Sequence, residues 1–64
     1  MEFRVRRLSN LTTIELQADT PREAAETAAS RWGNMRIGER VRVIAEDEPI
    51  QTFRLAETGW WQDA

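Results

Sequence analysis

Apolar and polar residues alternate over four short stretches of the chain. In the first stretch, Phe3 and Val5 fall on one side, and Arg4 and Arg6 fall on the other. A period of two is typical of a strand with one face buried and the other in water. The pattern therefore predicts four half-buried strands, at residues 2–8, 12–18, 40–45 and 50–56.

The segments between these strands carry turn and break signals. Ser9 and Asn10 follow the first strand, and their side chains can hydrogen bond to the nearby backbone, which predicts a tight turn. The first two strands then form a β-hairpin. After the third strand comes the acidic run 46–48, which we interpret as a solvated turn, followed by Pro49, which has no N–H to give to a sheet.

Signals for the N-terminus of a helix lie between the second and third strands. Thr20 is placed as N-cap, Pro21 as the first helical residue, and Glu23 as the partner of Thr20 in a capping box. Gly33 or Asn34 can adopt the left-handed conformation that ends a helix. The residues that recur on one face of this helix are Ala24, Ala25, Ala28, Ala29 and Trp32.

The order of elements is strand, strand, helix, strand, strand. We therefore predict a single α+β domain over residues 1–64, with a four-stranded antiparallel sheet in the order 2-1-3-4 and one helix packed on one face. Two conformations are compatible with the tail after Gly59: it can continue the fourth strand or fold back across the sheet.

The composition removes most catalytic and metal chemistry. The 64 residues include no cysteine and no histidine, which excludes disulfides, thiolate metal sites and the commonest general base. We expect no catalytic activity, no cofactor and no metal site. A domain of this size buries only about 60% of its unfolded surface, so a partner subunit is one source of added stability.

No apolar run approaches the roughly 18 residues of a membrane span, and no signal peptide is evident. We therefore expect no membrane association and a cytoplasmic location.

Arginine dominates the outward positions of the predicted sheet, where Glu15 is the one carboxylate. Guanidinium groups form bidentate hydrogen bonds with phosphates and carboxylates, so this face could bind nucleic acid, a nucleotide or an acidic protein surface. The alternative is a solvated face. Aromatic residues, which single-strand binders use for stacking, are missing from it unless the tail folds onto the sheet. The arginines are Arg4, Arg6, Arg40, Arg42 and Arg54.

Most carboxylates fall instead on the predicted helix and loops, which makes one side basic and the other acidic. They are Asp19, Glu23, Glu26, Glu46, Asp47 and Glu48.

Trp60 and Trp61 are the second candidate feature. Adjacent residues of an extended chain point to opposite faces. One tryptophan can therefore pack inward while the other anchors a partner, since tryptophan is enriched at interface hot spots. The alternative is that both close the small core.

These features favour a small non-catalytic binding module that attaches to a protein partner through its open sheet face, its edges or the tryptophan pair. An accessory or inhibitor protein of a phage or mobile element is one natural setting. The partner could also be a second copy of the chain, because edge strands can pair between chains. Two alternatives stay open: binding of nucleic acid or a phosphorylated ligand through the arginines, and a structural or assembly role.

Overall fold

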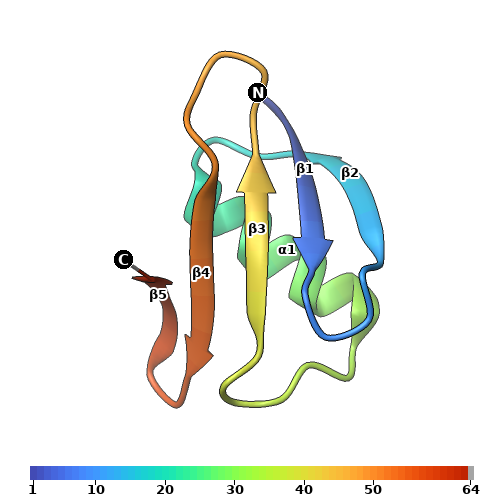
Figure 1. Cartoon of the computed structure of the whole chain (residues 1–64), viewed down its shortest axis with the longest axis vertical. Coiled ribbons are helices and arrows are strands. Elements are labelled where there is room, and N and C mark those ends of the chain that lie inside the picture. Colours follow the sequence, from blue (N-terminus) through green and yellow to red (C-terminus); the bar gives the residue numbers. More distant parts are fainter. Residues whose placement is uncertain (64) are drawn as a thin grey trace.

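The computed structural model describes the backbone of residues 1–63 and the side chains of residues 1–60. Over this part of the chain, one helix packs on one face of a five-stranded sheet, which confirms the α+β class (Figure 1). The elements are β1 Glu2–Arg7, β2 Thr13–Gln17, α1 Pro21–Trp32, β3 Arg40–Ile44, β4 Gln51–Ala56 and β5 Gly59–Asp63.

The sheet has the order β2-β1-β3-β4-β5, and each neighbouring pair is antiparallel. The first four strands follow the predicted order, but the prediction of four strands was wrong. The tail neither continues β4 nor crosses the sheet: it turns back at Glu57 and Thr58, so that Ala56 lies opposite Gly59. Gly59 has a φ of 123°, which residues with a side chain rarely adopt, and this lets the chain reverse there.

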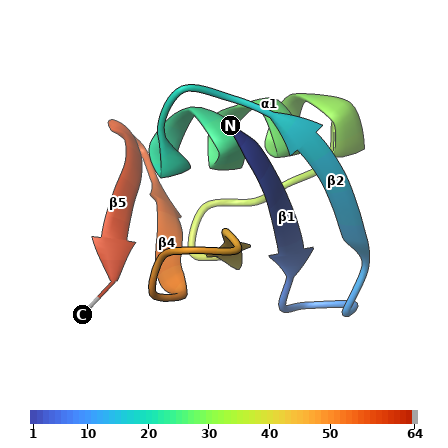
Figure 2. The ribbon, with the colours of Figure 1, turned by 90° about the horizontal axis from the view of Figure 1, so that it is seen from above.

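The sheet curls around the helix. Figure 2 shows β2 and β5 at opposite edges of the curl, with β3 between them and α1 on the concave side. The helix contacts all five strands. The opposite, convex face carries no helix within the described residues, and we call it the open face.

The concave side holds the core. Its largest fully buried side chains are Phe3, Val5, Val41 and Val43, and Phe53 and Trp60 are buried beside them. Ala24, Ala25 and Ala28 form the buried face of α1, and their small side chains allow the helix axis to lie close to the sheet. None of the described helices is long and apolar enough to cross a membrane.

The helix begins and ends at the predicted residues. The Thr20 hydroxyl accepts a hydrogen bond from the Glu23 N–H at 3.1 Å, and the Glu23 carboxylate accepts from the Asp19 N–H at 3.1 Å. At the other end, Gly33 has a φ of 73° and its N–H donates to the Ala29 carbonyl at 2.9 Å. The Thr20 half of the predicted capping box is therefore present, whereas the Glu23 carboxylate bonds to the Asp19 N–H and not to the Thr20 N–H that the capping box requires.

The connection between β1 and β2 is longer than the predicted tight turn. It spans residues 8–12 and is closed by a hydrogen bond of 2.8 Å from the Arg7 N–H to the Thr12 carbonyl. Asn10 contributes as its residue type suggests, since its side-chain oxygen accepts from the Thr12 N–H at 3.0 Å. Leu11 is left with a φ of 59°, and its side chain is 62% exposed.

Candidate functional site

The five arginines that strand alternation assigns to one face all lie exposed on the open face. They are Arg4, Arg6, Arg40, Arg42 and Arg54. They belong to the three central strands β1, β3 and β4, which Figure 1 shows side by side in front of the helix.

The register of the sheet brings four of these arginines into two opposed pairs. Arg6 lies directly opposite Arg42 across β1 and β3, and Arg40 lies opposite Arg54 across β3 and β4. Opposed residues have Cβ atoms about 4.5–5.5 Å apart, and successive outward residues of one strand lie about 7 Å apart. We call these four residues the arginine quartet: two neighbouring rows of like charge.

Arg4 has a different environment from the quartet. Its Nε lies 3.4 Å from the Glu15 carboxylate, which the register places opposite it on β2. Both side chains are more than half exposed, so this ion pair adds little to stability. It does offset the charge of Arg4.

Carboxylates are segregated less cleanly than the sequence suggested. The exposed side of α1 carries Arg22 and Arg31 as well as Glu23 and Glu26. The acidic run 46–48 follows the end of β3, whereas Arg40 begins that strand. Charge therefore changes along the strands as well as between the two faces.

The structure describes the two tryptophans of β5, which were predicted as partner-binding residues, to different extents. Trp60 is 6% exposed and packs in the core, so it is not accessible to a partner. The backbone of Trp61 lies opposite Arg54 in the register of β4 and β5, and the Trp61 side chain lies outside the described part of the structure. The tail thus forms a strand beside the quartet, which sequence reasoning left open.

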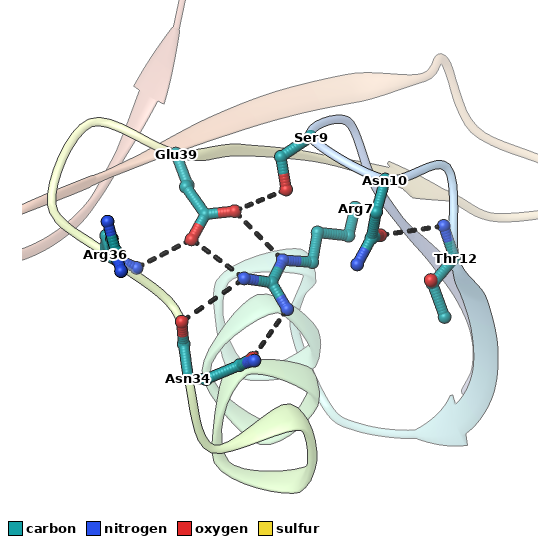
Figure 3. A network of polar contacts seen from close by, with 7 residues as sticks. All are labelled: Arg7, Ser9, Asn10, Thr12, Asn34, Arg36 and Glu39. Carbon is teal, nitrogen blue, oxygen red and sulfur yellow. Dashed lines mark hydrogen bonds and ion pairs between the residues drawn. The ribbon is translucent and has the colours of Figure 1, made fainter.

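Sequence reasoning missed a second polar cluster, at the end of β1 (Figure 3). Arg7 is 7% exposed and faces the helix side. Its Nε and Nη2 each donate to one oxygen of the Glu39 carboxylate at 2.9 Å, and its Nη1 donates to the Asn34 side chain at 2.7 Å. The guanidinium carbon also lies 5.7 Å from the centre of the Trp32 ring.

Glu39 is held by more than one donor in this cluster. Besides Arg7, it accepts hydrogen bonds from the Ser9 hydroxyl at 2.5 Å and from the Arg36 N–H at 2.7 Å. These hydrogen bonds, led by those from Arg7, lower the pKa of Glu39 from 4.5 to about 2. The same pairing raises the pKa of Arg7. The cluster joins the loop after β1 to the segment after α1, and we interpret it as structural.

The signal for Arg7 was present in the sequence. Arg7 lies two residues after Val5 and four after Phe3, so strand alternation places its side chain on the same, inward face as theirs.

Two hollows on the surface lie away from the quartet. One, of about 540 Å³, lies where the end of β2 meets α1, and its lining includes Asp19, Glu23 and Glu26. The other, of about 330 Å³, lies beside Arg4. Small ligands are held in concave sites, whereas the quartet lies on an exposed convex surface outside both hollows. Such a surface suits contact with another macromolecule.

Among residues 1–60, whose side chains are described, no group of three or more carboxylates is arranged to hold a metal ion. Neither a protein-family model, nor a characterised protein, nor a solved structure matches this chain.

Proposed function

We propose that the chain is a small binding module whose arginine quartet binds an acidic surface on a protein partner. The observation that carries this proposal is the direct opposition of Arg6 and Arg42 across β1 and β3, with Arg40 and Arg54 in the neighbouring row. Like charges directly opposite one another destabilise a sheet. Carboxylates placed between the guanidinium groups of Arg6 and Arg42 would remove the repulsion between them, so binding and relief of that repulsion occur together.

The chemistry of the quartet matches carboxylates well. Each guanidinium presents a planar fork of donors that fits both oxygens of one carboxylate. Carboxylates one turn apart on a helix have Cβ atoms about 5–6 Å apart, close to the spacing of Arg40 and Arg42 along β3. Thr52 lies next to Arg42 in the same row and adds a hydroxyl to the face.

The charges around the quartet favour a compact acidic patch over an extended polyanion. The chain has a net charge of −2, whereas nucleic-acid-binding domains are usually strongly basic. Glu15 and the acidic run 46–48 flank the arginines, and they would repel a nucleic acid that ran on across the sheet.

Single-stranded nucleic acid is the second candidate because of one observation. The backbone pairing of β5 puts Trp61 opposite Arg54, and an aromatic residue beside arginine is the combination on which bases stack.

A binding titration tests the two candidates together. The probes are a labelled flexible glutamate-rich peptide and a single-stranded oligonucleotide of the same net charge, each titrated at low and physiological salt. We expect the peptide to bind more tightly than the oligonucleotide. The double variant Arg6→Gln, Arg42→Gln should weaken peptide binding by about 10–100-fold, because each removes a charged hydrogen-bond donor.

The double variant Arg22→Gln, Arg31→Gln is the matched control, because it removes the same two charges from exposed sites on α1. It should change the affinity less than about threefold. Tighter binding of the oligonucleotide would replace the proposal with the nucleic-acid alternative, and no binding of either probe at low salt would exclude both.

A further inference from the structure

Besides the arginine quartet, the edge of β2 that does not face β1 is a second surface on which another chain could pair. This strand has β1 as its one neighbour in the described sheet (Figure 1). Hydrogen bonds from Arg7 to Thr12 and from Ala18 to Met1 fix which residues of β2 turn their backbone toward β1. Hydrogen-bonded pairs alternate along an antiparallel ladder. Ile14 and Leu16 therefore face β1, and the N–H and C=O groups of Thr13, Glu15 and Gln17 point away from the sheet.

Two of the usual devices that prevent pairing at an edge, proline and a bulge, are missing from β2. Natural edge strands are also blocked by being short or by charged side chains. β2 contains no proline, and its register with β1 runs without a bulge. Its one charged residue, Glu15, lies on the open face and pairs with Arg4.

Exposed apolar side chains lie at both ends of β2. Leu11 stands just before the strand and is 62% exposed, and Met1, whose carbonyl bonds to the residue after the strand, is 52% exposed. The left-handed backbone of Leu11 is unfavourable for a leucine. Ile14, on the helix side of β2, is only half-buried.

We infer that β2 pairs antiparallel with β2 of a second copy, about a two-fold axis at Glu15. This register opposes Thr13 to Gln17 of the other copy, and each opposed pair can exchange two backbone hydrogen bonds. On the helix side it sets Ile14 against Leu16 of the other copy, which extends the core across the interface. Continued past the strand end, this register brings Leu11 of each copy near Ala18 and Asp19 of the other copy.

The resulting dimer has one continuous sheet, with five strands from each copy and both quartets on the same open face. Short strands with few apolar contacts make a small interface, and Glu15 meets its own copy across the axis. Dimerisation is therefore weak and reversible. The quartet takes no part in it, so the binding proposal and this one can fail independently.

Sedimentation velocity over concentrations from about 10 µM to 1 mM tests the dimer. Two variants at the same residue separate backbone pairing from charge. Glu15→Pro removes an N–H that β1 does not use, so the monomer should keep its fold while the dimer dissociates at least about tenfold more readily. Glu15→Gln keeps the N–H and removes the repulsion, so its dimer should be about two- to fivefold tighter.

Amide hydrogen exchange gives a readout that does not depend on any variant folding. The amides of Thr13, Glu15 and Gln17 should gain protection as concentration rises, while those of Ile14 and Leu16 should be protected throughout. Leu11→Asn should weaken the dimer without destabilising the monomer, because asparagine tolerates the left-handed backbone. A parent chain that stays monomeric, or concentration-independent exchange at these three amides, would overturn the inference.

Discussion

Arg7 and Glu39 lie 32 positions apart in the sequence and meet through two parallel hydrogen bonds of 2.9 Å. The guanidinium is nearly buried at the end of β1, and the carboxylate stands just before β3. This contact ties the β1–β2 loop to the segment that follows the helix, so it closes one end of the core. Its dependence on the charge of Glu39 makes it testable by pH.

The stability of the domain should fall as the pH falls from about 4.5 to 2. The pKa of Glu39 is about 2 in the folded chain, against 4.5 for an unperturbed carboxyl group. The unfolded chain therefore takes up the proton at a higher pH than the folded chain does. The stabilisation is complete above about pH 4.5 and is lost progressively toward pH 2. Urea unfolding at a series of pH values measures this.

Glu39→Gln should be less stable than the parent at neutral pH and should flatten the acid part of the profile. Glu26→Gln, which removes an exposed carboxylate from α1, is the control and should leave the profile nearly as it is. An unchanged acid profile in Glu39→Gln would show that another carboxyl group controls it.

Arg42→Gln should raise the free energy of unfolding by a few tenths of a kcal/mol, up to about 1 kcal/mol, at low salt. It removes one of two like charges that face each other across β1 and β3. Because salt screens exposed charges, the gain should shrink in about 1 M salt. Arg4→Gln is the comparison: it breaks an ion pair, so it should leave stability unchanged or slightly lower. A loss of stability in Arg42→Gln would argue against repulsion within the quartet.

Trp60→Ala should reduce the stability by about 3–5 kcal/mol, which is a large share of what a domain of this size has. Trp60 is 6% exposed and lies opposite Leu55 in the ladder that joins β5 to β4. Circular dichroism and urea unfolding would show loss of cooperative folding, and Trp60→Phe should recover much of it. A well-folded Trp60→Ala chain would mean that β5 contributes little to the core.

Thr20→Ala should cost about 1 kcal/mol, within a range of about 0.5–2 kcal/mol. The hydroxyl of Thr20 accepts a hydrogen bond from the Glu23 N–H at the start of α1, and alanine leaves that N–H without its acceptor. Thr20→Ser keeps the acceptor and should stay near the parent in thermal unfolding. Equal losses in both variants would point to packing of the threonine methyl group instead.

The parts of this fold that could be predicted from sequence are those set by neighbouring residues. The cap at Thr20, the end at Gly33 and the alternation in the first four strands all depend on local contacts or a local period. The fifth strand was not predicted for two reasons. The turn at Glu57 and Thr58 lacks the usual hairpin residues, and two adjacent tryptophans break the alternation of apolar and polar residues.

The candidate site divides in the same way. Exposure of the five arginines followed from alternation within each strand. Their opposition in pairs could not be predicted, because it depends on the register between strands that lie far apart in sequence. Arg7 was missed because its charge favoured the surface, while its position in the strand placed it inside, and its partners at Asn34 and Glu39 carry no local signal.

The curl of the sheet also constrains the shape of whatever meets the quartet. β1 and β4 curve away from β3, which lies between them (Figure 2). Side chains that point outward from a convex sheet therefore diverge from one strand to the next. A flat or rod-shaped partner aligned with β3 would contact Arg40 and Arg42, while Arg6 and Arg54 would slope away on either side. Whereas a flexible peptide can follow the curve, a rigid partner that engages all four must therefore be hollowed, with carboxylates on both walls. In such a complex the binding cleft belongs to the partner, and the convex sheet face of this domain inserts into it.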